Sequence, residues 1–332
     1  MMIETKLLKS NTDDDLNEVV DLLSKGELVA VPTETVYGLA GDAKNTDAVK
    51  KIFTAKNRPR DHPLIVHIAS FEQLSDWVRY IPESSKALAS AFWPGPLTIV
   101  FNKKKSVNNV VTGGLETIAI RVPNEPSLLK VLHKLNTGLA APSANTHKRI
   151  SPTAASHVLE TLNGKIAAVL DSGDCTIGLE STILDLTTEV PTILRPGPIS
   201  KKNLESIMGV DIKFSKSENK KIPGNMKIHY QPRTRSFLMD ITEINKIISD
   251  VLYTKHLFGV IHISKLSNKN LNVRSIKMPR TKTLYAKSIY RSMHELDKIK
   301  PFKILIETPP KGEDWIHIHD KLSKATNNPN LS

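Results

Sequence analysis

The stretch Val31-Pro32-Thr33-Glu34-Thr35-Val36-Tyr37-Gly38-Leu39-Ala40 decides how the rest of this chain is interpreted. It follows the apolar run Leu28–Val31, which is typical of a buried strand. Pro32 has no N–H to donate to a neighbouring strand, so the strand is predicted to end there. Two hydroxyls, a carboxylate and a phenol follow at the end of that strand, where open α/β sheets bind ligands. A capped turn that leads into a helix would explain the same residues, and the local chemistry leaves both interpretations open.

The composition limits the class of protein. The 332 residues suggest two domains. Lys and Arg number 46 against 34 Asp and Glu, and the resulting net charge of +12 favours an anionic partner such as a nucleotide, pyrophosphate or RNA. A merely basic surface explains the charge equally well. Hydrophobic residues make up 39% of the chain, which is enough for ordinary cores.

The single cysteine and the absence of long apolar runs bear on location. Cys175 has no partner for an intramolecular disulfide, which fits a reducing compartment. Its acidic neighbours Asp171 and Asp174 should raise the pKa of the thiol, so no nucleophilic role is expected. Neither a signal peptide nor a run of about 18 apolar residues is visible. We expect a cytoplasmic protein without a membrane contact.

Two helices are predicted around the opening stretch, and a cationic loop follows them. Acids at 13–15 precede a helical pattern that Gly26 should close, and Thr46 should cap a helix that contains Ala48, Val49, Ile52 and Phe53. Lys56, Arg58 and Arg60 then lie within five positions, just before a predicted strand at 64–68. Such cations can hold a triphosphate, but a solvated basic loop is the commoner outcome.

Further polar groups follow predicted strands later in the chain. Arg121 ends the strand that starts at Thr117 and is a candidate clamp for a carboxylate, or else an exposed edge residue. The apolar run at 139–142 leads into Ser143 and Asn145, which can contact phosphate or ribose. Ser151 is expected to cap the next helix, whose N-terminus would suit an anion; capping alone would also explain it.

Six blocks carry a resemblance to a known family. They are PTETVYGL at 32–39, KxRP with PLIVH at 56–67, WPGPLT at 93–98, SAN with SPT at 143–153, EST at 180–182 and LRPG at 194–197. In this order and spacing the chain resembles the Sua5/YrdC family, the threonylcarbamoyl-AMP synthases. His147 and Lys148 stand where the family usually has Ser-Gly, which leaves the shape of that loop open.

The resemblance continues into a linker and a second domain. PGNMKIHYQP at 223–232 looks like the linker of the two-domain Sua5 branch, with Gln231 in place of the usual Ala and Asn225 inserted. In that branch the linker lies over the active site, which implies that Tyr230 faces the nucleotide; anchoring of His229 and Tyr230 on a domain surface is the alternative. Strands at 237–239, 257–261 and 304–306 alternate with helices at 281–296 and 315–325, which predicts βαβ units in a small open sheet.

The resemblance therefore implies an α/β fold with three segments. Residues 1–208 would form a YrdC-like twisted open sheet with a concave cavity, 209–235 the linker, and 236–327 a smaller Rossmann-like α/β C-terminal (Sua5) domain. No GxGxxG follows a strand in the second domain, so gating or positioning is expected there rather than chemistry.

The implied reaction converts L-threonine, bicarbonate and ATP into L-threonylcarbamoyl-AMP and pyrophosphate, for the t6A modification at position 37 of tRNA. Lys56 and Arg58 are the implied catalytic residues. The implied threonine site consists of Thr33, His67, Arg121, Ala141 and Ser181. The implied ATP site consists of Lys56, Arg58, Thr117, Ser143, Asn145, Ser151, Arg195 and Tyr230. Mg²⁺ is expected to arrive with ATP, held mostly by phosphate oxygens and water.

Several points stay open at this stage. Glu34 and Glu180 are the carboxylates nearest the blocks, and a structural hydrogen bond is expected for each rather than a role as base. The product would pass to the t6A transferase machinery, and direct contact with RNA is open. One alternative is an RNA-binding module without ATP chemistry, although 5% aromatic residues argue against base stacking. Another is a carbamoyl-transfer relative, which would need zinc-finger cysteines that the chain lacks.

Overall fold

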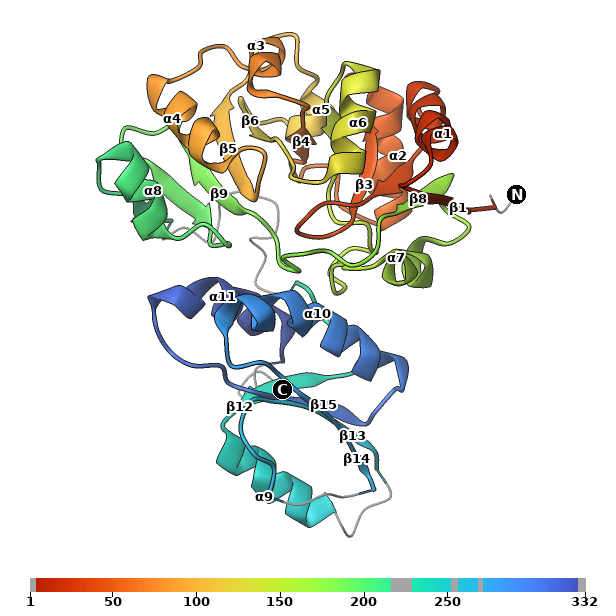
Figure 1. The fold of residues 1–332 in the computed structure, drawn as a ribbon, viewed down its shortest axis with the longest axis vertical. Coiled ribbons are helices and arrows are strands. Elements are labelled where there is room, and N and C mark those ends of the chain that lie inside the picture. The colour runs from red at the N-terminus through yellow and green to blue at the C-terminus, as the bar shows by residue number, and fades with distance from the viewer. Residues whose placement is uncertain (1–3, 216–228, 252–255, 268–270, 328–332) are drawn as a thin grey trace. The chain divides into compact units, whose positions relative to one another are not determined.

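The computed structural model describes residues 4–215, 229–251, 256–267 and 271–327. The chain divides into two compact units, which are described separately here (Figure 1). The first unit holds residues 1–147 and 151–225, and the second holds 148–150 and 226–332. Most of the linker motif predicted at 223–232 lies outside the described residues. None of the described helices is long and apolar enough to cross a lipid bilayer.

The first unit is built on a mixed sheet whose strand order is β1-β8-β2-β3-β7-β4-β6-β5-β9-β10-β11. Neighbouring strands pair in both directions; β4 and β6 are parallel, whereas β5 and β6 are antiparallel. The strands are β1 (Lys6–Lys9), β2 (Val29–Val31), β3 (Gly38–Asp42), β4 (Ile65–His67), β5 (Leu97–Asn102), β6 (Thr117–Arg121), β7 (Leu139–Ala140), β8 (Ala168–Asp171), β9 (Thr182–Asp185), β10 (Thr192–Arg195) and β11 (Lys213–Phe214).

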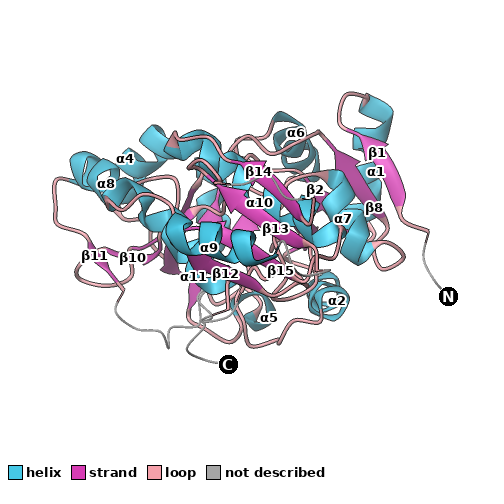
Figure 2. Ribbon diagram, turned by 90° about the horizontal axis from the view of Figure 1, so that it is seen from below, coloured by secondary structure: helices cyan, strands magenta, loops and turns pink. Residues whose placement is uncertain are grey.

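Helices alternate with these strands along the chain; Figure 2 colours helices cyan and strands magenta. The helices are α1 (Asp13–Ser24), α2 (Thr46–Lys56), α3 (Leu74–Trp77), α4 (Glu83–Phe92), α5 (Asn109–Thr112), α6 (Pro126–Leu135), α7 (Ala155–Leu162) and α8 (Lys201–Met208). The mixed α/β class predicted from the sequence is confirmed. The polar segment after 200 was expected to be a short helix and then a linker, but β11 lies within it and pairs with β10.

Two predicted helix caps are wrong. Asn45, not Thr46, caps α2, because its side-chain oxygen accepts from the N–H groups of residues 47 and 48 while Thr46 is already helical. Ser151 is not a cap either. Helix α7 begins at Ala155 after Ala154, which makes no side-chain cap. Ser151 instead donates to Glu180, as the next subsection describes.

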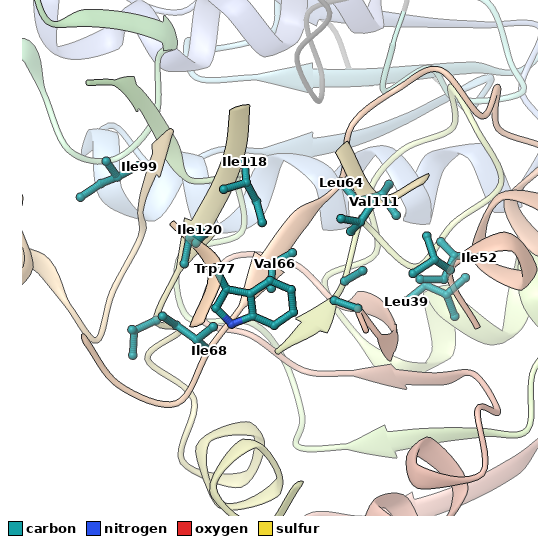
Figure 3. Packing of buried hydrophobic residues seen from close by; sticks show 14 of the residues in the cluster. Leu39, Ile52, Leu64, Val66, Ile68, Trp77, Ile99, Val111, Ile118 and Ile120 are labelled. Carbon is teal, nitrogen blue, oxygen red and sulfur yellow. The ribbon is translucent and has the colours of Figure 1, made fainter. Parts of the chain in front are cut away.

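Alternation along the central strands separates the core from the polar residues. Val66, Ile118 and Ile120 point into the main core, together with Leu39, Leu64 and Trp77 (Figure 3). Side chains alternate between the faces of a sheet, so His67 and Arg121, one position further on, lie on the opposite face. A small apolar cluster on that face contains Ile65, Val100, Ala119, Ile183 and Leu194. The sheet therefore presents buried polar groups beside a second, smaller apolar layer.

The second unit has a four-stranded, fully parallel sheet with the order β12-β15-β13-β14. Its strands are β12 (Ser236–Met239), β13 (Phe258–His262), β14 (Val273–Lys277) and β15 (Lys303–Glu307), and its helices are α9 (Ile241–Val251), α10 (Lys282–Lys298) and α11 (Ile316–Ala325). Helix α9 covers one face and α10 with α11 the other (Figure 1). The predicted βαβ sheet is confirmed; β14 and α9 were not predicted.

Candidate active site

The turn after β2 is held together by its own hydroxyls. The Thr33 hydroxyl accepts from the backbone N–H groups of Thr35 and Val36, each at 3.1 Å, and donates to the carbonyl of Val36 at 2.7 Å. It also lies 2.8 Å from the Thr35 hydroxyl. Thr33 is 3% exposed. These bonds give Thr33 a structural task in fixing the turn; its contact with threonine stays a prediction.

Arg121 connects this turn to the end of β6. Its Nη1 donates to the Thr35 hydroxyl at 2.9 Å, its Nε donates to the Gly95 carbonyl at 3.0 Å, and its Nη2 lies 2.6 Å from a carboxylate oxygen of Glu34. The side chains of Arg121 and Glu34 are each only 4% exposed. The guanidinium thus already pairs with a carboxylate, which is the chemistry predicted for a substrate's carboxylate. The structural hydrogen bond expected for Glu34 is not found: Glu34 forms an ion pair with Arg121, and among the described residues neither of its carboxylate oxygens has a hydrogen-bond donor.

His67 is the β4 neighbour of Arg121 in the parallel pairing of β4 with β6. Burial, and then the charge of Arg121, lower the pKa of His67 to about 3. The imidazole is therefore neutral at pH 7 and can contact a substrate without adding a positive charge.

We predict that His67 makes the protein less stable as the pH falls. An unfolded histidine binds a proton near pH 6.5, whereas folded His67 stays neutral down to about pH 3. Between these values the unfolded state binds more protons, so the free energy of unfolding decreases by up to about 1.4 kcal/mol per pH unit on acidification. Urea unfolding at pH 7, 6 and 5 measures this slope. His67→Gln should flatten it, and His133→Gln, at an exposed position on α6, should not. Equal slopes for wild type and His67→Gln would contradict the prediction.

Lys56 joins two of the predicted ATP-binding blocks. This last residue of α2 is 1% exposed, and its ammonium donates to the backbone carbonyls of Ser143 and, at 2.6 Å, of Asn145. Burial, and then the neighbouring charge of Arg58, hold the pKa of Lys56 well below its usual range. Arg58 is also buried and donates to the Pro63 carbonyl at 3.2 Å. Two cations are thus held close together inside the protein, an arrangement that an anion would stabilise.

Ser181 joins the EST and LRPG blocks. Arg195 donates to the Ser181 carbonyl and to the Ser181 hydroxyl, each at 3.0 Å. The Thr98 hydroxyl of β5 lies 2.7 Å from that same hydroxyl. A Cβ on Gly197 would lie 2.2 Å from the backbone nitrogen of Thr182, so only glycine fits in the LRPG turn. Sequence reasoning missed Thr98, although a hydroxyl inside the apolar strand 97–101 was a visible signal.

A hydrogen bond between Ser151 and Glu180 connects the SPT block to the EST block. The Ser151 hydroxyl donates to the Glu180 carboxylate at 2.6 Å, which confirms the expectation of a structural bond for Glu180. The carbonyl of Pro152 accepts from the backbone N–H of Tyr37 at 2.8 Å, so SPT also lies against the opening stretch. Burial raises the pKa of nearby Cys175, the direction expected, with smaller effects from Glu125, Glu34 and Asp174.

The loop that departs from the family pattern is ordered by its backbone. The N–H of His147 donates to the carbonyl of Lys56 at 2.8 Å, and the rings of His147 and His62 lie edge to face at 5.8 Å. Lys148 has φ of 69°, the left-handed conformation that glycine adopts without cost. The loop at this position therefore keeps a backbone shape suited to the family's usual glycine, with a lysine in its place.

Three other predicted site residues, Thr117, Tyr230 and Ala141, lie on different elements. Thr117 starts β6 and Arg121 ends it, so the two lie about 13 Å apart. Tyr230 belongs to the second unit, where its ring stacks on Tyr290 at 5.8 Å and lies 5.7 Å from the ammonium of Lys321. Ala141 directly follows β7, and its backbone N–H donates to the Ile65 carbonyl. No group of three or more His, Cys, Asp or Glu within the described ranges is placed to hold a metal ion.

The fold and the site together define an α/β protein with buried cations and hydroxyls at the strand ends of a mixed sheet. Two family descriptions match the chain: "Telomere recombination" (Sua5_yciO_yrdC) over residues 21–197, and "Threonylcarbamoyl-AMP synthase, C-terminal domain" over 199–327. The chain therefore belongs to the Sua5/YrdC family of threonylcarbamoyl-AMP synthases and has the two-domain Sua5 form.

Individual relatives agree with this assignment. The threonylcarbamoyl-AMP synthase of Bacillus subtilis is 46% identical over 325 residues, which cover 95% of this chain and 94% of the relative. The synthase of Schizosaccharomyces pombe is 34% identical, and the alignment covers 95% of this chain and 89% of the relative. Among solved structures, the P. abyssi Sua5 complexed with L-threonine matches with a TM-score of 0.89 at 35% identity, over 97% of both chains.

Proposed function

We propose that the chain is a nucleotidyltransferase that makes L-threonylcarbamoyl-AMP and pyrophosphate from L-threonine, bicarbonate and ATP. The observation that carries this proposal is the linkage of six sequence blocks through buried polar contacts in one unit, centred on Lys56, Arg121 and Ser181. Relatives that align with almost the whole chain are named for this activity. A solved Sua5 with the same fold is complexed with L-threonine.

The proposed chemistry has two steps. The threonine amine and bicarbonate first form an N-carboxylate and release water. An oxygen of this N-carboxylate then attacks the α-phosphate of ATP, the bond to the β-phosphate oxygen breaks, and pyrophosphate leaves. Three anionic groups have to meet, so the protein's main tasks are to position them and to neutralise their charge. The neutral His67 and the buried cations suit these tasks.

The proposed threonine site lies where β4 and β6 end. Arg121 holds the threonine carboxylate, which then shares or replaces the position of the Glu34 carboxylate. Neutral His67 and the hydroxyls of Thr33 and Ser181 contact the polar groups of threonine, and Ala141 lines the site. A cation that already binds one buried carboxylate has the right charge and planarity for a second.

The proposed ATP site contains the cations of the first unit. Lys56 and Arg58 hold the phosphates and Arg195 completes the basic wall, while Thr117, Ser143, Asn145 and Ser151 contact the nucleotide. Tyr230 is the proposed contribution of the linker. ATP enters as its Mg²⁺ complex, a substrate whose metal is bound by phosphate oxygens and water. Mg²⁺ usually keeps several waters and binds substrate phosphates, which suits this way of entering the site.

The product places the protein in tRNA modification. Threonylcarbamoyl-AMP is the activated group for t6A at position 37, and we propose that it passes to a t6A transferase in the cytoplasm. We keep the proposed segments 1–208, 209–235 and 236–327 as catalytic domain, linker and C-terminal domain.

Pyrophosphate release from ATP tests the proposal directly. We expect release only when L-threonine and bicarbonate are both present, because the attacking group forms from these two. A bicarbonate-depleted buffer and L-serine in place of L-threonine are the controls. Release that is independent of threonine, or ATP binding without any release, would contradict the proposed function.

A further inference from the structure

The positive charge of the chain is concentrated in its C-terminal third. Residues 226–332 contain 19 Lys and Arg against 9 Asp and Glu, while residues 1–225 contain 27 against 25. The C-terminal third therefore accounts for ten of the twelve net charges. The synthase reaction gives no reason for this asymmetry, because the anionic substrates are assigned to the first unit. An excess of this size on a small α/β unit favours a polyanionic partner.

Part of this charge gathers at one edge of the second unit's sheet. All four strands are parallel, so they begin at the same edge. Arg235 precedes β12, His256 precedes β13, and Lys303 is the first residue of β15. Two backbone bonds fix these strand starts side by side, from Ile304 to the Arg235 carbonyl at 2.9 Å and from Phe302 to the Leu257 carbonyl at 2.8 Å.

Aromatic rings lie among these cations. Phe302 is 52% exposed, and the ring of the exposed His256 stacks on it with centroids 4.5 Å apart and planes 19° from parallel. The ammonium of Lys303 lies 5.2 Å from the Phe302 centroid and 5.3 Å from that of Phe237. We call Arg233, Arg235, His256, Lys300, Phe302 and Lys303 the basic–aromatic edge.

Acidic groups near this edge offset part of its charge and leave the cations in excess. Asp250 and Glu295 lie near the ends of α9 and α10 that lead to it. The carboxylate of Asp297 accepts from the backbone N–H groups of Arg233 at 2.9 Å and Thr234 at 2.7 Å, which holds this acid in place beside the edge. Arg233, Arg235 and Lys300 are all exposed.

We propose that the basic–aromatic edge binds single-stranded RNA. Single strands are bound by exposed aromatic rings that stack on bases and by cations that follow the phosphates, and this edge offers both. An anionic membrane is better matched by an amphipathic helix with an apolar face, whereas the edge consists of loops and strand starts. The choice of RNA over DNA rests on the proposed function, whose product modifies tRNA; the surface itself does not depend on it. The low aromatic content of the chain does not oppose this, because the structure brings two rings together.

Fluorescence anisotropy of a labelled 12-nucleotide oligouridylate tests the proposal on the full-length protein without ATP or threonine. We expect binding that weakens steeply between 50 and 200 mM KCl. Phe302→Ala should weaken it about tenfold by removing a stacking surface. Lys300→Gln should reduce the slope of log K against log salt by about 0.7, the value for one phosphate contact on a single strand. Tyr80→Ala and Lys86→Gln, an exposed aromatic and an exposed lysine of the first unit, are matched controls that should bind like wild type.

The outcomes are distinct from those of the synthase assay. Both edge variants should keep wild-type melting temperature and threonine-dependent pyrophosphate release, so lost RNA binding cannot be ascribed to misfolding. The proposal is overturned if the wild-type protein does not bind the RNA at 50 mM KCl. It is also overturned if Phe302→Ala and Lys300→Gln bind the RNA as tightly as wild type, or if the first-unit controls lose as much affinity as these two variants. Tighter binding of the same sequence as DNA, or binding to phosphatidylserine vesicles alone, would also overturn it.

Discussion

Lys56→Met is expected to reduce threonine-dependent pyrophosphate release at least about 100-fold in kcat/KM. Removing a single preorganised donor to developing negative charge typically costs about 10²–10³ in rate. We expect Lys56 to act as such a donor, because the backbone carbonyls of Ser143 and Asn145 hold its ammonium in place inside the protein. Methionine keeps a stem of similar length without the charge. The rate is measured at saturating threonine with ATP varied, which separates KM for ATP from kcat.

The pH dependence gives this prediction a second readout. Burial and Arg58 lower the pKa of Lys56, so in the free enzyme its ammonium loses a proton at a lower pH than an ordinary lysine does. A bound triphosphate favours the charged form. The affinity for ATP should therefore decrease as the pH rises through the lowered pKa. Lys56→Arg keeps the charge at all working pH values and should lose this decrease.

Stability has to be separated from activity in these variants. Lys56→Met removes the ammonium that donates to the Ser143 and Asn145 carbonyls, which costs about 1–3 kcal/mol of unfolding free energy. Lys50→Met on the exposed side of the same helix should change neither activity nor stability, since its side chain is 45% exposed. A folded Lys56→Met protein with wild-type kcat/KM would refute the role of Lys56.

Much of the site could be predicted from the sequence because its residues follow strand ends with strong local signals. Pro32 ends β2 at the predicted place, and Arg121 is the last residue of β6. Apolar runs before the PTETVYGL and SAN blocks predicted strands β2 and β7, and the order of the blocks indicated the family. Local patterns of this kind are contained in a few neighbouring residues, so a single sequence reveals them.

What the sequence could not provide depends on long-range pairing. Ser151 looked like a helix cap, but its partner is Glu180, which lies 29 positions further along the chain. The paired carboxylate of Arg121 is Glu34, and the neighbour of Ser181 is Thr98. Strand β11 forms because β10 offers an edge to pair with, not because its two residues favour a strand. These partners are far apart in the sequence, so only the tertiary structure shows which residues pair.

Arg121→Met is expected to raise KM for L-threonine about 100-fold with a smaller effect on KM for ATP. Truncating one partner of a buried, hydrogen-bonded charge pair costs about 2–5 kcal/mol of binding free energy. If Arg121 holds the threonine carboxylate, wild type should also discriminate strongly against L-threoninol, which lacks that carboxylate. The variant should have lost this discrimination, because nothing is left to recognise the missing group. Arg79→Met, at an exposed position, is the matched control.

Because Arg121 pairs with Glu34, Arg121→Met changes the stability of the fold as well as the binding of threonine. A double variant that also changes Glu34 separates the two effects. Removing Arg121 leaves the Glu34 carboxylate buried without its partner, which destabilises the fold by about 3–5 kcal/mol. Glu34→Gln combined with Arg121→Met removes the uncompensated charge, so the double variant should be more stable than Arg121→Met alone. Activity should not return with stability, because the double variant still lacks the cation for threonine. Recovery of wild-type KM for threonine in the double variant would show that Arg121 serves only to neutralise Glu34.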